Sequence, residues 1–216
     1  MTLGGGVGLI ALAFALSNAD AGATGPDRQR YQIDVPRSRF VVHTTTSGVS
    51  SMFGHDHKIE IRSYDGTVTL AAGKVDNATL DLTVRADGLH AIEEKDEAIT
   101  AEIDSALHDH VLEAGAFPVI TFSGRAIAAR RRDDGAFDVT LRGDLRLHGV
   151  RRTVTVPLRL TFTDDAMRAS GKLSLRQTDY NIVPFSFAGG TVTVANRVAL
   201  SFDIVAYKNA GAAPPR

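Results

Sequence analysis

Two histidines flank an aspartate in the stretch FGHDHKIEI, residues 53–61. Imidazole and carboxylate side chains often bind metal ions or transfer protons near neutral pH. If residues 55–61 form a strand, His55 and His57 point to one side and Asp56 to the other, because side chains alternate along a strand. Two histidines spaced in this way can share one metal ion, but the remaining ligands must come from elsewhere in the chain.

Three interpretations of the His55–His57 pair stay open. In the first, the pair hydrogen-bonds backbone groups beside a turn at Gly54, since polar residues cluster at turns. In the second, it meets the polar head of a bound amphiphile, such as a pyrophosphate or a quinone. In the third, it binds a metal ion, and a metal-bound water would then make the protein an enzyme. Candidates for the third metal ligand are His110, His148 and His43.

Other catalytic schemes find no support in the sequence. The chain has no cysteine, which excludes cysteine nucleophiles, disulfide scaffolds and zinc fingers. It contains no GxSxG motif, and no spacing singles out a Ser-His-Asp triad. We interpret Asp179-Tyr180 as a structural corner. The sequence therefore predicts a protein that is not an enzyme and requires no cofactor.

Composition and charge narrow the class of protein further. The chain has 24 Lys and Arg against 25 Asp and Glu, a net charge of −1, which argues against a nucleic-acid binder with a broad basic surface. Hydrophobic residues make up 44% and charged residues 23%, as in ordinary globular domains. The length of 216 residues suits one domain with a sizeable core.

The first residues have the features of a secretory signal peptide. The apolar run Val7–Leu16 is too short to span a bilayer, and Ala19-Asp20-Ala21 fits a small-x-small cleavage site. We predict a signal peptide at 1–23 and thus a periplasmic or secreted protein. The predicted organisation continues with a linker at 24–30, a domain at 31–208 and a flexible tail at 209–216.

Alternation of apolar and polar residues dominates the rest of the chain. In VRRTVTVPLRLTF, residues 150–162, one parity is apolar and the other is mostly Thr and Arg. This pattern is typical of a strand with one buried face. Eight or nine such strands, separated by turn signals, predict a mainly all-β antiparallel barrel or sandwich.

One segment, residues 93–114, has a different period. Ile99, Ile103, Leu107 and Val111 recur every four residues, which predicts one amphipathic helix inserted among the strands. Gly and Pro residues after the segment mark its end. We expect this helix to cap one opening of the barrel.

Four segments, taken in order, resemble the YceI-like family, the bacterial polyisoprenoid-binding domains. They are YQIDVPRSRFVV (31–42), HVLEAGAFPVITFSG (110–124), DLRLHGVRRTVTVPL (144–158) and GKLSLRQTDYNIVP (171–184). The resemblance implies an antiparallel, eight-stranded, lipocalin-like barrel with an apolar tunnel. It also implies that a long-tailed amphiphile, of the polyisoprenoid, quinone or fatty-acid type, binds in the tunnel of an exported carrier.

Residues of one parity are the candidates for the tunnel lining. Alternation alone leaves a cavity and a filled core open, because eight-stranded barrels have either. The candidate lining residues are Leu80, Leu82, Val84, Phe122, Leu145, Leu147, Val154, Val156, Leu158, Leu173 and Leu175. His55, His57 and His148 are the candidate rim or head-group residues. The expected partner is therefore the amphiphile itself; transient membrane contact and a homodimer stay open.

Overall fold

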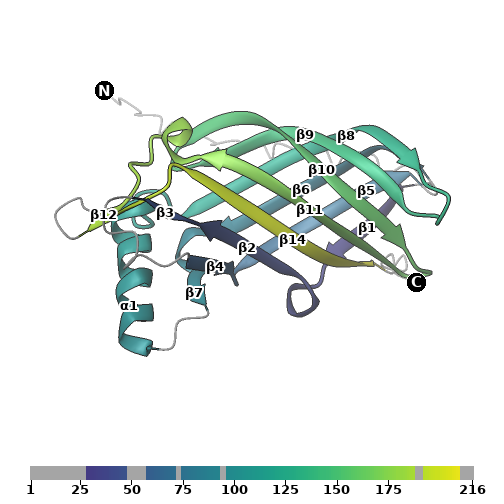
Figure 1. Cartoon of the computed structure of the whole chain (residues 1–216). Coiled ribbons are helices and arrows are strands. Elements are labelled where there is room, and N and C mark those ends of the chain that lie inside the picture. The colour runs from purple at the N-terminus through teal and green to yellow at the C-terminus, as the bar shows by residue number, and fades with distance from the viewer. Residues whose placement is uncertain (1–27, 48–56, 72–73, 93–95, 188–191, 210–216) are drawn as a thin grey trace, which may run out of the picture.

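The alternating segments form eight strands that close into an antiparallel barrel. The computed structural model describes residues 28–47, 57–71, 74–92, 96–187 and 192–209. In order around the barrel, the strands are β1 (Arg28–Ile33), β5 (Tyr64–Ala71), β6 (Lys74–Arg85), β8 (Val119–Arg131), β9 (Phe137–Leu147), β10 (Val150–Phe162), β11 (Ala166–Arg176) and β14 (Arg197–Lys208). Pairing of β1 with β14 closes the barrel, seen from the side in Figure 1. The predicted eight-stranded antiparallel barrel is confirmed.

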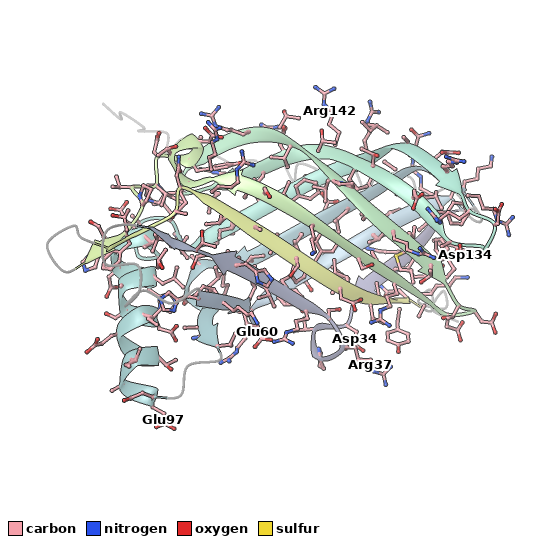
Figure 2. All side chains as sticks on the ribbon, in the orientation of Figure 1. Asp34, Arg37, Glu60, Glu97, Asp134 and Arg142 are labelled. Atoms are coloured by element: carbon pink, nitrogen blue, oxygen red, sulfur yellow. The ribbon has the colours of Figure 1, made fainter. Side chains whose placement is uncertain are left out.

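The predicted parity decides which side chains enter the barrel. On β10, Val156 and Leu160 are buried, while the neighbouring Thr155 and Arg159 are exposed. Figure 2 shows Arg142 of β9 pointing away from the barrel. Most apolar side chains of the barrel strands therefore gather inside, and charged side chains form ion pairs on the outer surface.

The first segment of the domain forms two strands with a short helix between them. β1 ends before a short 3-10 helix at Val35–Arg37, and β2 (Arg39–Thr44) follows. Asp34 caps this helix, because its carboxylate accepts a hydrogen bond from the Arg37 N–H at 3.1 Å. Pro36 fixes the backbone of the helix and cannot donate to a strand ladder. The chain therefore bends here and pairs with β14 twice.

A three-stranded extension continues the barrel wall at one end. β2 pairs with β14, β4 (His57–Ile61) pairs with β2, and β7 (Leu89–Ile92) pairs with β4. Short strands at the same end form a second small sheet (Figure 1): β3 (Thr46–Ser47), β12 (Ser186–Phe187) and β13 (Val192–Val194). The barrel strands thus run from a plain end, made of turns, to an elaborated end.

The predicted helix lies at the elaborated end, beside β7 (Figure 1). Helix α1 (Glu97–Ala106) continues as one π turn at Leu107–Val111, so that the helical segment is shorter than the predicted 93–114. Its N-cap is Asp96, whose carboxylate accepts the Ala98 N–H at 2.8 Å. None of the described helices is long and apolar enough to cross a membrane.

Side chains of the helical segment bind the outer edge of β7. The Asp104 carboxylate accepts a hydrogen bond from the Ala91 N–H at 2.7 Å, and its other oxygen lies 3.0 Å from His90 Nδ1. His108 Nε2 lies 2.7 Å from the Leu89 carbonyl oxygen. An edge strand exposes backbone groups that need partners. Here the helix supplies them, which holds it against the sheet.

Candidate ligand-binding cavity

The barrel encloses a cavity with a volume of about 1160 Å³. All eight barrel strands contribute inward-facing side chains to its wall, and most of these are Leu, Ile, Val or Phe. Pockets for drug-sized ligands usually measure about 300–1,000 Å³. The barrel is therefore hollow, and its interior has room for a larger apolar molecule.

Most of the predicted lining residues do face this cavity. Ten of the eleven line it: Leu80, Leu82, Val84, Phe122, Leu145, Leu147, Val156, Leu158, Leu173 and Leu175. The exception is Val154, which packs as a partly buried residue against the hydrophobic core and stands opposite Gly143. Alternation gives the direction of a side chain but not whether neighbours separate it from the cavity.

One end of the cavity, the closed end, is sealed by aromatic packing. Phe162 and Met167 line the cavity there. The ring of Phe162 makes edge contacts with the rings of Tyr31 and Phe137, at centroid distances of 6.4 and 6.1 Å. Met167 is only 4% exposed. Edge-to-face packing of this kind is favourable for aromatic rings and leaves little space between them.

The other end of the cavity, the mouth, opens at the elaborated end of the barrel, beside α1. Asp96, Ile99 and Glu102 line the cavity and are themselves exposed to solvent. Ile103 and Leu107 of the same helical segment line it more deeply and are partly buried. The helix therefore forms one wall of the mouth. Its predicted apolar stripe faces the cavity, with Ile99 at the outer edge.

Polar residues line the cavity mainly at the mouth. β4 contributes His57 and Lys58, and the end of β11 contributes Arg176. The two acids named above are the N-cap of α1 and a residue within this helix. Charges of both signs therefore surround the opening. The strands behind it are apolar, so a ligand with an apolar tail would enter tail first.

Comparison with known proteins agrees with this architecture. A family model described as the YceI-like domain matches residues 31–206. The chain belongs to the YceI-like domain family. Among curated proteins, no sequence matches it.

Solved structures share the fold of this YceI-like domain at low sequence identity. BcnA of Burkholderia cenocepacia is 17% identical, with a TM-score of 0.60 over 80% of this chain and 98% of that one. A polyisoprenoid binding domain from Saccharophagus degradans is 12% identical, with a TM-score of 0.60 over 82% and 98%. The YCEI protein of Campylobacter jejuni is 13% identical, with a TM-score of 0.53 over 69% and 83%.

The predicted histidines of the YceI-like domain lie in different surroundings. His57 lines the cavity near the mouth, and His55 lies outside the described residues. His110 is exposed and stacks on Phe185, with ring centroids 6.3 Å apart. His43 lies 2.9 Å from the Ser201 hydroxyl, across the β2–β14 pair. Within the described residues, no three His, Cys, Asp or Glu side chains are grouped to hold a metal ion.

His148 has a structural position in the turn between β9 and β10. Its φ of 49° lies in the left-handed region. Its Nδ1 lies 3.2 Å from the Tyr180 carbonyl oxygen, and its Nε2 lies 2.8 Å from the Glu113 carboxylate. The ring packs on Phe117 at a centroid distance of 4.3 Å. His148 does not line the cavity; it joins the β9–β10 turn to the chain that follows β11.

Many lining residues were not among the predicted ones, and two of these are polar and buried. Gln177 and Tyr180 belong to a 3-10 helix, η5 (Gln177–Tyr180), that follows β11, and both line the cavity. Gln177 continues the inward parity of Leu173 and Leu175, a signal present in the sequence. Tyr180 was interpreted only as part of a corner. Burial raises the pKa of the Tyr180 phenol, an effect that Arg152 opposes and Asp179 reinforces, so its hydroxyl stays protonated at neutral pH.

Proposed function

We propose that this YceI-like domain is a non-enzymatic carrier that holds the apolar tail of a long amphiphile inside its barrel. The ligand class is a polyisoprenoid, a quinone or a fatty acyl compound. The observation that carries the proposal is the cavity of about 1160 Å³ with its predominantly apolar wall. The fold similarity to a domain described as polyisoprenoid binding supports the same class.

The size of the hydrophobic contribution favours a long tail. Each buried methylene contributes roughly 0.8 kcal/mol, so that ten contribute about 8 kcal/mol. Association costs roughly 4–15 kcal/mol in lost translational and rotational freedom. A short tail therefore gains too little from an apolar wall, whereas a chain well beyond ten carbons binds with useful affinity.

The place of action is part of the proposal. The apolar run and cleavage-site pattern at 1–23 support export, and we propose that the carrier works in the periplasm or as a secreted protein. A ligand taken from or delivered to a membrane would pass the mouth beside α1, which suits transient contact with the membrane surface.

The direct test is to purify the protein, extract it with organic solvent and identify the extracted lipids by mass spectrometry. We expect a long-chain isoprenoid, quinone or fatty compound in near-stoichiometric amount. A protein that yields no lipid and binds none of these compounds when they are added would contradict the proposal.

Two neighbouring substitutions on β11 provide a matched control. Ala169 lines the cavity, and Ser170 is exposed on the outer face. Ala169→Trp should fill part of the cavity and weaken binding of a long chain by at least about ten-fold, while Ser170→Trp should leave binding unchanged. The chain has no tryptophan, so the emission of each introduced indole also reports on its own surroundings. Equal binding by the two variants would place the ligand outside the barrel.

A further inference from the structure

The helix η5 places two buried polar side chains in the cavity wall. Gln177 is 8% exposed and Tyr180 is 2% exposed, and both line the cavity. Among the described residues, Gln177 is the only polar or charged residue of the buried class apart from the tyrosines. Residues at positions i and i+3 of a 3-10 helix lie above one another. The two side chains therefore share one face of η5.

The hydroxyl of Tyr180 differs from those of the other three tyrosines. The Tyr31 hydroxyl donates to Gln29 Oε1, that of Tyr64 to backbone carbonyls, and that of Tyr207 accepts from Arg37. Within the described part of the chain, no group hydrogen-bonds the Tyr180 hydroxyl. Yet no side-chain polar atom of that part is both sealed from solvent and unpartnered. Because Tyr180 lines the cavity, we infer that its hydroxyl faces the cavity.

The side chain of Gln177 presents an acceptor. Its Nε2 donates a hydrogen bond to the Ala195 carbonyl oxygen at 2.9 Å, which fixes the orientation of the amide. The Oε1 atom then has no hydrogen-bond partner among the residues that the structure describes. Buried polar groups in folded proteins are nearly always hydrogen-bonded. An unpaired donor and an unpaired acceptor thus lie in one apolar wall and form a polar site.

The backbone of η5 is held in place on both sides. The Gln177 N–H donates to the Asn196 carbonyl oxygen at 2.8 Å, and the Tyr180 carbonyl oxygen lies 3.2 Å from His148 Nδ1. Asn181 ends the helix in the left-handed conformation, with φ at 59°. The two polar groups are therefore preorganised, and a ligand does not have to order them.

The donor and the acceptor of η5 together favour an uncharged ligand group. Two cations flank η5: Arg176 is exposed and lines the cavity, and exposed Arg152 donates to the Asp179 carbonyl oxygen. The Gln177 Oε1 atom carries partial negative charge and would repel a carboxylate or phosphate oxygen beside it. A hydroxyl group fits both partners, because it accepts one hydrogen bond and donates another.

We propose that Gln177 and Tyr180 form a polar subsite for the uncharged hydroxyl head group of a long-chain alcohol. The ligand hydroxyl accepts a hydrogen bond from the Tyr180 O–H and donates one to Gln177 Oε1. The subsite rests on the proposed function, since the alcohol's tail must occupy the apolar cavity.

The test compares three ligands with one isoprenoid skeleton: geranylgeraniol, its phosphate ester and the corresponding hydrocarbon. Each displaces a fluorescent fatty-chain probe from the wild type, from Tyr180→Phe and from Tyr207→Phe. We expect the wild type to bind the alcohol more tightly than the other two ligands. Tyr180→Phe should weaken alcohol binding by about five-fold, the effect of one hydrogen bond, and leave hydrocarbon binding unchanged.

The control variant and the folding measurement separate the subsite from general damage. Tyr207→Phe removes a hydroxyl that lies outside the cavity and should change the affinity for none of the ligands. The melting temperature of ligand-free Tyr180→Phe should not fall, since no hydrogen bond within the described protein is lost.

Each other outcome overturns the subsite. Equal wild-type affinities for alcohol and hydrocarbon, or an alcohol affinity that Tyr180→Phe leaves unchanged, would refute the subsite and leave the carrier proposal standing. Tighter binding of the phosphate ester would assign an anionic head group instead. Failure of the fluorescent probe and of all three ligands to bind would refute the carrier proposal together with the subsite, whereas a bound probe that none of the three displaces would refute the subsite alone.

Discussion

The closed end and the mouth of the barrel are built from the same strands but are held together by different interactions. At the closed end, the ring of Phe162 packs on the rings of Tyr31 and Phe137, and Phe162 pairs with the buried Met167 on the neighbouring strand. At the mouth, the helical segment is attached through Asp104 and His108, which bind backbone groups of β7. Apolar packing thus closes one end, and a few hydrogen bonds hold the wall of the other.

This difference indicates where the molecule can open. Dense aromatic packing is lost only at a large cost in free energy, because many contacts break together. Individual hydrogen bonds to a solvent-accessible helix each contribute little net stability. Segments of low local stability are the ones that open without global unfolding. Ligand exchange is therefore expected at the mouth, with the closed end rigid.

The largest predicted effect comes from emptying the closed end. Phe162→Ala removes the ring that contacts both other aromatics and should lower the free energy of unfolding by about 3–5 kcal/mol in a urea titration. Thr161→Ala, its exposed neighbour on β10, should change that free energy by less than about 0.5 kcal/mol. Similar losses in the two variants would mean that the packing described here does not hold this end.

An intermediate effect is predicted at the mouth. Asp104→Ala leaves the Ala91 N–H without its acceptor and should cost about 1–3 kcal/mol of unfolding free energy. Hydrogen exchange at Ala91 should accelerate, and a bound ligand should dissociate faster while the cavity stays intact. Glu97→Ala is the control, since Glu97 lies at the outer tip of α1 (Figure 2). Unchanged exchange in Asp104→Ala would show that other contacts hold the helix.

The smallest effect is predicted for a polar group at the closed end. The pKa of Asp134 is lowered, first by the Ala136 N–H that its carboxylate accepts and also by Arg159 and Arg132. A lowered folded-state pKa gives stability that is present above the unfolded pKa and lost as pH falls below about 4. Asp134→Ala should therefore lower the melting temperature at pH 7 by less than either variant above, and this difference should shrink under acid.

Asp133→Ala, the neighbouring exposed acid, is the control for the Asp134 measurement. It should leave the melting temperature unchanged at both pH values. A large, pH-dependent loss in Asp134→Ala would mean that polar contacts, and not only aromatic packing, hold the closed end together.

The sequence predicts the barrel well because the alternation of apolar and polar residues along each strand is a local pattern. Alternation on β10 indicates that Val156 and Leu158 face inward, and both line the cavity. The same rule assigns Val154 to the wall but cannot tell that it packs against neighbours instead. The bend between β1 and β2 has two signals in the sequence, the capping residue Asp34 and Pro36. Because the residues on each side of the bend alternate as in a strand, these signals are easily missed.

The candidate subsite is harder to predict from sequence, because it depends on partners that come from distant segments. The orientation of the Gln177 amide is fixed by Ala195, and the position of Tyr180 by His148. No spacing in the sequence predicts these contacts between distant segments. Parity extends the inward face as far as Gln177, but only the folded chain reveals which tyrosine hydroxyl has no hydrogen-bond partner among the described residues.

The double pairing of β14 has a consequence for the order of assembly. One half of this strand pairs with β1 and the other with β2, so residues from near 30 and near 205 must meet before the wall is complete. Pairings between distant parts of a chain form late in folding, because the intervening loop must first be closed. A growing polypeptide that lacks its last strand has no enclosed space, and the interior of the barrel can be occupied only after that strand has docked.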